Sequence, residues 1–482
     1  MKVTFLIPPV LDQTRDVDRC FGCNYSIYFL PLVAMLYPAT ACKLQGHAVV
    51  VHDFAALRKS EKAFREFAAA DDSDIYCFYT VFLSQRTDRL ARDILRAARP
   101  SARFIFFGPQ PTWDASVFLD QENSYVVRGE AELVLPRLVA ALAGGEDLAG
   151  MEGVSHRAAS GPVHNPPAPY IKDLDALPVP DRTLLDHRPY SNPKLHSRPH
   201  AAILTSRGCY AQCWYCVPNS LSYARELEHK RHHGVKPPVR LHSAQRVVEE
   251  MSRLAALGFK SVSVIDDQFL WDEPRTAAIC AGIQDLGLEW SCLARCDRVT
   301  DRAAEAMARA GCAYVDLGTE SFDQKVLDAV GKNIRAEDTE KAVRILKKHG
   351  IAVELNILFG ATPVETEETI QLTLRELKRL DVDYVLFSIA NPFPGTAFYD
   401  AAKANGWMAY GDYVPVDPAR DSIISYPHLS AERLEELVAR AYRGHYLHPR
   451  TLWRELRKTK DLADLRDKFV TGLRFLQRNF AK

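Results

Sequence analysis

The chain has 482 residues, of which 47% are apolar and 25% are charged, a composition typical of a folded protein with more than one core. Lysine plus arginine equals aspartate plus glutamate at 61 each, so the net charge favours no polyanionic partner and we expect no nucleic-acid binding. No segment approaches the roughly 20 apolar residues of a transmembrane helix. The first apolar run stops at Pro8-Pro9, too early for a signal peptide, so we expect a cytoplasmic protein.

Residues 1–145 alternate short apolar strands with helical segments. This pattern predicts a parallel sheet with helices on both faces, a doubly wound Rossmann-like or flavodoxin-like domain of the α/β class. The predicted strands are Val3–Ile7, Ala48–His52, Ile75–Tyr79, Arg103–Gly108 and Tyr125–Arg128, and two predicted helices are Arg86–Ala98 and Ala131–Leu142. Ligands of such sheets bind beyond the carboxyl ends of the strands, so we expect a site there. The loops concerned are Pro8-Pro9, His52-Asp53, Thr80–Gln85 and Gly108–Thr112.

A proline-rich segment follows this domain. Nine prolines lie in the 38 residues from Pro162 to Pro199, a density that excludes regular helix and central strand. We therefore predict that residues 146–196 form an extended linker between two domains.

Residues 197–400 repeat the strand-helix alternation six times, which predicts a (β/α)6 partial barrel with its chemistry at the carboxyl ends of the strands. The predicted strands are Ala202–Thr205, Ser261–Ile265, Trp290–Ala294, Tyr314–Gly318, Ala352–Phe359 and Tyr384–Ile389, and the helices include Ala244–Leu257, Asp301–Ala310 and Thr339–His349. Residues 401–482 have a helical pattern, which predicts a helical C-terminal region. Its end, Arg450–Lys482, carries ten basic and four acidic residues. A solvated helical face is the first interpretation, and contact with an acidic partner or a membrane surface is the second.

Three of the eleven cysteines lie in one loop after the first barrel strand. Cys209, Cys213 and Cys216 are separated by three and then two residues, and thiolates at this spacing can bind three irons of a four-iron cluster. Three ligands leave the fourth iron open to a substrate or cofactor. The alternatives are cysteines that only pack in a core, and a structural zinc ion, for which no fourth ligand with suitable spacing precedes His229.

With Tyr215 before the last cysteine, this loop resembles the signature of the radical S-adenosylmethionine (radical SAM) enzymes. The resemblance implies a 4Fe-4S cluster that cleaves S-adenosylmethionine reductively to a 5′-deoxyadenosyl radical. It also implies an electron donor such as flavodoxin or ferredoxin. Segments similar to the family's cofactor site follow the later strands in the expected order. The S-adenosylmethionine contacts implied by them are Tyr215, Asp266, Asp267, Gln268, Arg295, Glu320, Ser321, Phe359 and Gly360.

The chemistry of the cofactor fits two of these positions. A sulfonium cofactor that chelates iron through its amine and carboxylate needs an acid beside its ammonium group and a cation beside its carboxylate. Asp266 or Asp267 offers the acid, and Arg295 offers the cation. The alternatives without a role in cofactor binding are a helix cap for the aspartates and a surface charge for the arginine. The loop Gly360–Thr366 departs from the family's common form by one extra residue and a missing glycine.

The N-terminal domain and the linker resemble the cobalamin-binding branch of this family. The contacts that the resemblance implies are Pro8, Pro9, Thr80, Ser84, Gln85, Gly108, Pro109, Thr112, Gly129 and Glu130. Many cobalamin proteins bind cobalt through the histidine of an Asp-x-His-x-x-Gly loop. This chain has no such loop, because His52-Asp53 reverses the order. We interpret His52 as a polar residue at a strand end and expect any corrin to be bound without a histidine ligand.

The resemblance implies an enzyme that methylates an unactivated carbon of a small-molecule or natural-product substrate, with cobalamin as the methyl carrier. One alternative is a radical SAM cyclase, rearrangement or oxidation enzyme without methyl transfer, of the tetrapyrrole or hopanoid type. Another is a cobalamin- or tetrapyrrole-binding carrier or sensor with a vestigial cluster.

The sequence allows more than one role for each of two further segments. Cys20 and Cys23 form a CxxC pair that fits a redox pair, a metal half-site or part of a substrate pocket. Residues Ser220–Arg240, rich in Lys, Arg and His, are interpreted as a loop that contacts an acidic substrate or faces water.

Overall fold

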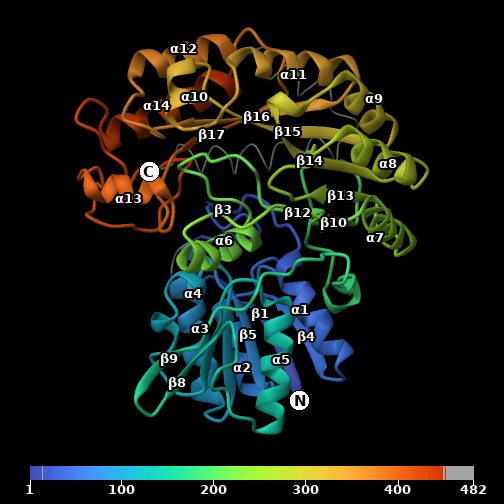
Figure 1. Ribbon diagram of the computed structural model, residues 1–482, viewed down its shortest axis with the longest axis vertical. Helices are drawn as coiled ribbons and strands as arrows, with labels where there is room; N and C mark the ends of the chain where they lie inside the picture. The colour runs from blue at the N-terminus through green and yellow to red at the C-terminus, as the bar shows by residue number, and fades with distance from the viewer. Residues whose placement is uncertain (13–14, 449–450, 452–482) are drawn as a thin grey trace. The chain divides into compact units, whose positions relative to one another are not determined.

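The computed structural model describes residues 1–12, 15–448 and 451, which form two compact units (Figure 1). The first unit comprises residues 1–210, 217–292 and 309–311. The second comprises residues 211–216, 293–308 and the described residues from 312 onward. These units do not follow the expected boundaries at residues 145, 196 and 400, because the first unit holds the N-terminal sheet together with the first three barrel strands, up to Cys292.

The first unit contains a seven-stranded sheet. Its parallel strands are β1 (Lys2–Ile7), β4 (Ala48–Asp53), β5 (Ile75–Tyr79), β6 (Arg103–Phe107) and β7 (Ser124–Val127). They lie side by side in the order β4-β1-β5-β6-β7, which in chain order is the flavodoxin-like arrangement 2-1-3-4-5. The five predicted strands and the doubly wound class are confirmed. The strand order reverses between β1 and β5, the place where such folds bind ligands.

Helices cover both faces of this sheet (Figure 1). The four largest are α1 (Val33–Leu44), α2 (Glu61–Ala70), α3 (Gln85–Ala98) and α5 (Ala131–Gly144). Helices α1 and α5 pack together over a core that includes Cys77, while α2 and α3 pack together over a second core that includes Phe78. Neighbouring residues of β5 therefore enter opposite cores, as the alternation of side chains along a strand requires.

Two strands that we did not predict extend the sheet beyond β7. They are β8 (Val154–Ala158) and β9 (Gly161–His164), which form an antiparallel hairpin. Both lie in residues 146–196, so the prediction of an extended linker is wrong for this stretch. Pro162 lies in β9 at the edge of the sheet, where a missing N–H breaks no ladder hydrogen bond.

The remaining elements of the first unit include a helix where we expected a loop. Helix α6 (Ser220–His233) begins at Asn219, whose side chain accepts a hydrogen bond from the Ser222 N–H, and ends at Gly234 with φ +72°. Its first nine residues are all buried, so the interpretation of Ser220–Arg240 as a loop is wrong. The shorter elements are β2 (Val17–Asp18), β3 (Asn24–Tyr25), η1 (Phe82–Ser84), α4 (Pro109–Trp113), η2 (Ser116–Phe118), η3 (Arg182–Leu184), β11 (Ser206–Arg207) and β12 (Arg240–Leu241).

The six predicted barrel strands are all present in chain order. In the first unit, β10 (His200–Ile203), β13 (Ser261–Val264) and the start of β14 (Glu289–Arg295) pair in parallel. In the second, β15 (Cys312–Glu320), β16 (Ala352–Phe359) and β17 (Tyr384–Ile389) pair in parallel. The helices among them are α7 (Ala244–Ala256), α8 (Glu273–Ile283), η4 (Cys296–Arg298), α9 (Asp301–Arg309), α10 (Gln324–Ala329), α11 (Ala336–Lys348) and α12 (Glu367–Leu377). This alternation confirms the predicted α/β partial-barrel class.

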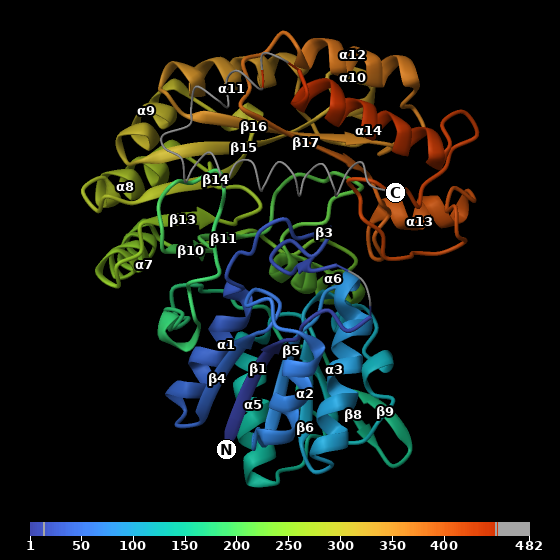
Figure 2. The same cartoon turned by 180° about the vertical axis from the view of Figure 1, so that it is seen from behind.

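The second unit ends in the predicted helical region, with α13 (Ala397–Ala404) and α14 (Ala431–Tyr446). Figure 2 shows α11, α12 and α14 along one side of β15–β17. The Tyr442 hydroxyl donates to the Phe387 carbonyl at 2.7 Å, which ties α14 to β17. The basic segment Arg450–Lys482 lies outside the described residues apart from Thr451. Within the described ranges, none of the helices combines the length and apolar character needed to cross a membrane.

Candidate functional site

The chain that leads into the cysteine loop is held by the carboxylate of Asp266. This carboxylate accepts a hydrogen bond from the Thr205 backbone N–H at 2.6 Å and from the hydroxyls of Thr205 and Ser206 at 2.5 and 2.7 Å. Asp266 is fully buried, and burial raises its pKa. The end of β10 is thereby joined to the loop that follows β13.

Asp267 holds the two ends of the cysteine loop. Its carboxylate accepts hydrogen bonds from the backbone N–H of Gly208 at 3.0 Å and of Asn219 at 2.6 Å. Burial raises the pKa of Asp267 to about 6. The amide of Gln268 is buried as well and donates to the Leu270 carbonyl at 2.7 Å. These three side chains, expected beside S-adenosylmethionine, thus have a bracing role in the structure, and their contact with the cofactor stays a prediction.

Three other expected S-adenosylmethionine contacts lie together in the second unit. The Nζ atom of Lys332 lies 2.7 Å from Oε1 of Glu320, and the Tyr215 hydroxyl is also hydrogen-bonded to Glu320. Arg295 donates to the Lys332 carbonyl at 3.0 Å and pairs with Asp297 at 2.9 Å. Tyr215, Glu320 and Arg295 therefore meet around Lys332, a residue that sequence reasoning missed because a lysine after a short helix has no distinctive pattern.

The turn that carries Lys332 packs against the cysteine loop. The Trp214 N–H donates to the Val330 carbonyl at 3.2 Å, and a Cβ atom on Gly331 would lie 4.0 Å from the Cys213 Cα. Although burial opposes it, the charges of Glu320 and Cys213 raise the pKa of Lys332. The second unit therefore presents a buried cation beside the central cysteine.

The last expected S-adenosylmethionine contacts are Ser321, Phe359 and Gly360. Ser321 is buried with its hydroxyl 3.1 Å from that of Thr373, and Phe359 is buried at the end of β16. Gly360 has φ +73°, and its N–H donates to Oε2 of Glu365 at 2.5 Å. Burial raises the pKa of Glu365 to about 8, so this side chain, which we did not single out, is mostly protonated at neutral pH.

All eleven cysteines are free thiols. Cys213 is buried, whereas Cys209 and Cys216 are partly exposed, and the Cys216 N–H donates to the Cys213 carbonyl at 3.2 Å. Across residues 1–12, 15–448 and 451, no three His, Cys, Asp or Glu side chains converge as they would around a single metal ion. A four-iron cluster does not require such convergence, because each thiolate binds a different iron. The other predicted core cysteines are buried, namely Cys42, Cys77, Cys280, Cys292, Cys296 and Cys312.

The Cys20–Cys23 pair lies in the turn between β2 and β3. The Asp18 carboxylate accepts a hydrogen bond from the Cys20 N–H at 2.9 Å, which closes the turn. Burial raises the pKa of both thiols, that of Cys23 to about 12. Protonated thiols are poor nucleophiles, so this burial disfavours the interpretation of the two cysteines as a redox pair.

A buried charge cluster lies at the carboxyl end of β7. Oε1 of Glu130 accepts hydrogen bonds from Arg207 at 2.6 Å and from Arg240 at 2.5 Å, and Oε2 accepts one from the Ile171 N–H at 2.8 Å. Although burial opposes ionisation, the two arginines lower the pKa of Glu130 to about 2. The carboxylate that we expected to contact cobalamin is therefore engaged within the protein.

Several other expected cobalamin contacts are engaged in the same way. Ser84 donates to Asp88 at 2.9 Å, Gln85 accepts from Gln110 at 2.5 Å, and the Thr112 hydroxyl accepts from the Gly129 N–H at 3.0 Å. Pro8, Pro9, Thr80, Gly108 and Pro109 are buried. The ring of His52 lies 5.0 Å from that of Phe67 on α2, so His52 belongs to an aromatic cluster.

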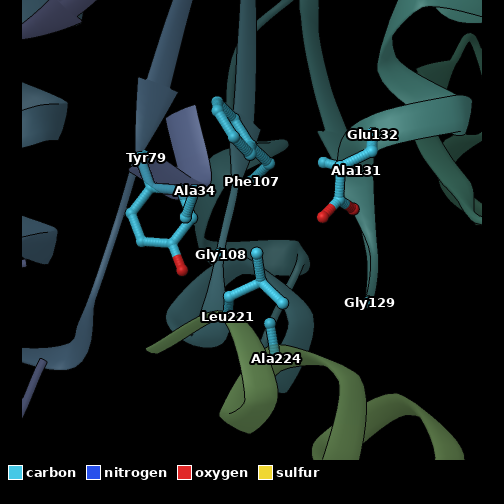
Figure 3. A pocket seen from close by; sticks show the side chains of 9 residues that line it. All are labelled: Ala34, Tyr79, Phe107, Gly108, Gly129, Ala131, Glu132, Leu221 and Ala224. Carbon is cyan, nitrogen blue, oxygen red and sulfur yellow. The ribbon is translucent and has the colours of Figure 1, made fainter. Parts of the chain in front are cut away.

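Figure 3 shows the cavity at the carboxyl ends of β5 and β6, with Glu132 directed into it. The lining residues are Ala34, Tyr79, Phe107, Gly108, Gly129, Ala131, Glu132, Leu221 and Ala224. Its volume is about 10 Å³, which is room for roughly one water molecule. A corrin therefore does not fit inside it, because Leu221 and Ala224 of α6 cover these strand ends.

We predict that Glu130→Gln destabilises the first unit by about 3–5 kcal/mol at pH 7, since it removes the carboxylate that pairs with buried Arg240 and leaves buried Arg207 with Glu132 alone. Because the pKa of Glu130 is lowered, its contribution is present above its ordinary pKa of 4.5 and is lost as the pH falls toward 2. Urea unfolding at pH 7 and pH 4 should show the difference between variant and wild type narrowing in acid. The control Glu61→Gln, in an exposed pair with Arg65, should cost at most about 1 kcal/mol.

Glu365→Gln tests the raised pKa in the loop after β16. A carboxyl group whose folded-state pKa is about 8 contributes stability that is fully present below 4.5 and is lost as the pH rises toward 8. We therefore expect the Tm of the wild-type protein to fall relative to that of the variant between pH 5 and 8.5. Parallel Tm profiles would contradict this prediction.

The sequence of the chain is similar to those of known proteins. The sequence model of the radical SAM superfamily matches residues 203–377. The chain is 34% identical over 475 residues to the uncharacterized methyltransferase PH0819 of Pyrococcus horikoshii, which covers 95% of both chains. It is 27% identical over 280 residues to an anaerobic magnesium-protoporphyrin IX monomethyl ester cyclase of Rubrivivax gelatinosus, which covers 56% of this chain and 47% of the relative.

Solved structures share the fold. The radical SAM methyltransferase TsrM from Kitasatospora setae, solved with cobalamin and a [4Fe-4S] cluster, matches with a TM-score of 0.67 and 21% identity over 92% of this chain and 85% of that chain. The cobalamin-dependent radical SAM enzyme OxsB matches with a TM-score of 0.61 and 16% identity over 92% of this chain and 61% of that chain. Given the near full-length match to PH0819 and the cysteine loop inside the matched region, this chain belongs to the radical SAM superfamily, in the family of that methyltransferase.

Proposed function

We propose that this protein is a cobalamin-dependent radical SAM methyltransferase that modifies an unactivated carbon of a small molecule. The observation that carries the proposal is the 34% identity to a methyltransferase over 95% of both chains. The structures of TsrM with bound cobalamin and of OxsB with bound aqua-cobalamin support it through their fold. The chemistry requires a low-potential electron, for which we propose flavodoxin or ferredoxin as donor, in the cytoplasm.

In this proposal Cys209, Cys213 and Cys216 hold a 4Fe-4S cluster, which supplies the electron for reductive cleavage of S-adenosylmethionine. Asp267 keeps the two ends of the cysteine loop in place through the N–H groups of Gly208 and Asn219. A rigid loop matters because a ligand set that shifts cannot hold one iron open in a constant position.

The polar group around Lys332 is our proposed site for S-adenosylmethionine. The guanidinium of Arg295 and the ammonium of Lys332 supply positive charge for its carboxylate, and the carboxylate of Glu320 can accept hydrogen bonds from ribose hydroxyls. These side chains are largely buried, so they act on a bound cofactor in surroundings with little water.

Cobalamin would supply the methyl group that the substrate receives. Because the side chains of Ser84, Thr112 and Glu130 are engaged within the first unit, and Pro8, Pro9 and Gly108 are buried, we propose that the corrin is held by shape and by backbone contacts outside the small cavity, not by these residues. His52 has no role in this site, since its ring belongs to the aromatic cluster on α2.

We predict that Cys213→Ala loses the cluster and forms no 5′-deoxyadenosine. The matched control is Cys42→Ala, which removes a buried thiol on α1 and should retain both iron and activity. The measurements are iron and sulfide content after anaerobic reconstitution, and 5′-deoxyadenosine released after reduction. If Cys213→Ala releases as much 5′-deoxyadenosine as wild type, the assignment of the cluster fails.

Metal content and a methyl label separate the proposed function from its rivals. Anaerobically purified and reconstituted protein should contain roughly four irons and four sulfides per chain and bind cobalamin. Methyl-labelled S-adenosylmethionine should transfer its label to bound cobalamin in the reduced protein. Cluster formation without cobalamin binding would favour a cyclase, rearrangement or oxidation enzyme, whereas cobalamin binding without a cluster would favour a carrier or sensor.

A further inference from the structure

Helix α6 presents two residues to Gly208, which directly precedes Cys209. Gly208 has φ +88°, and its N–H donates to the Ser222 hydroxyl at 3.1 Å. A Cβ atom on Gly208 would lie 2.4 Å from Nη2 of Arg225, so the guanidinium packs against the glycine Cα. Ser222 and Arg225 are three positions apart and so share one face of the helix. Only glycine combines this backbone conformation with so close a neighbour.

The guanidinium of Arg225 is buried and incompletely hydrogen-bonded. The side chain is 2% exposed, and Nη1 donates to the Pro238 carbonyl at 3.2 Å. Its Nε and Nη2 atoms are inaccessible to solvent and find no acceptor among the residues that the structure describes. Burial lowers the pKa of Arg225 to about 10, so the group is charged at neutral pH. A buried donor without a partner costs about 1–3 kcal/mol, and more when it is charged.

The acids nearest to Arg225 already have partners. Glu130 accepts from Arg207 and Arg240, and Asp267 accepts from backbone N–H groups at the ends of the cysteine loop. Glu226 lies 3.3 Å from Lys230 and 3.8 Å from Lys236. The positive charge of Arg225 is therefore not matched by a hydrogen-bonded carboxylate in the described part of the first unit. The guanidinium packs against Gly208, and the next residue in the chain is Cys209, which we assign to the cluster.

We propose that Arg225 is a positioning residue for the iron-sulfur cluster: its guanidinium supports Gly208, and its two free N–H directions and its charge offset the negative charge that the thiolate of Cys209 and the cluster bring. This inference rests on the proposed function. The reduction potential of such a cluster depends on net charge and on hydrogen bonds to its sulfurs. A nearby cation stabilises the reduced, more negative form, so Arg225 raises the potential.

The experiment uses the full chain, reconstituted with iron and sulfide, and compares three variants with the wild type. Arg225→Gln removes the charge, Arg225→Lys keeps it, and Arg253→Gln removes a charge from an exposed pair on α7 as a control. The readouts are iron content and the midpoint potential from a redox titration followed by electron paramagnetic resonance. We expect Arg225→Gln to lower the ratio of reduced to oxidised cluster at a fixed solution potential by about tenfold, equivalent to about 59 mV. Arg225→Lys should change the ratio by less than about threefold, and Arg253→Gln by less than about twofold.

The outcomes separate this inference from the proposed function. If the wild-type protein binds no cluster, the proposed function fails and the inference fails with it. If the wild type binds a cluster and Arg225→Gln keeps its potential, only the inference is overturned. If Arg225→Gln does not fold, a near wild-type potential in Arg225→Lys supports the inference, whereas equal loss of iron in both Arg225 variants identifies a purely structural role and overturns it.

Discussion

The buried ion pairs of Glu130 are the interaction on which the arrangement of the first unit depends. One carboxylate at the end of β7 binds Arg207, 77 residues later, and Arg240, 110 residues later. These arginines lie on β11 and β12, the two short strands that flank the cysteine loop and α6. A buried charge without its partner is costly, so the flavodoxin-like sheet and the start of the barrel order each other. This constraint accounts for a compact unit that crosses the expected domain boundary.

Buried polar side chains also hold the chain on either side of the cysteine loop. The carboxylates of Asp266 and Asp267 accept hydrogen bonds from backbone N–H groups. The guanidinium of Arg225 packs against Gly208, and two of its nitrogens have no hydrogen-bond acceptor among the described residues. Most of these polar groups are satisfied by the protein itself, which keeps the loop in one conformation before any cofactor arrives. Pre-organisation of this kind lowers the entropy cost of assembling a site and holds its ligands within a narrow range of positions.

The second unit also contains a buried group of charged side chains close to a cysteine. Arg295 binds the carbonyl of Lys332, and the ammonium group of Lys332 binds Glu320, so a cation, a carboxylate and a guanidinium occupy one small region next to Cys213. Glu320 has φ +66°, an uncommon conformation for a residue other than glycine. Such strain is typically retained where a side chain must point in one direction for function.

The sequence by itself determined the eleven strands of the two parallel sheets, because buried strands are apolar runs between turns. It also predicts the three cysteines that we propose as cluster ligands, because they lie within eight residues of one another. Tertiary structure alone decided the rest. We did not predict helix α6, because Arg225 and Glu228 give its sequence a polar pattern. Both side chains are nevertheless buried, Arg225 against Gly208 and Glu228 against Arg128. Glu130 binds two arginines, which its sequence context did not predict, while its expected contact with cobalamin stays a prediction. Local sequence shows which side chains carry charge, whereas only the folded chain decides which opposite charge each one meets.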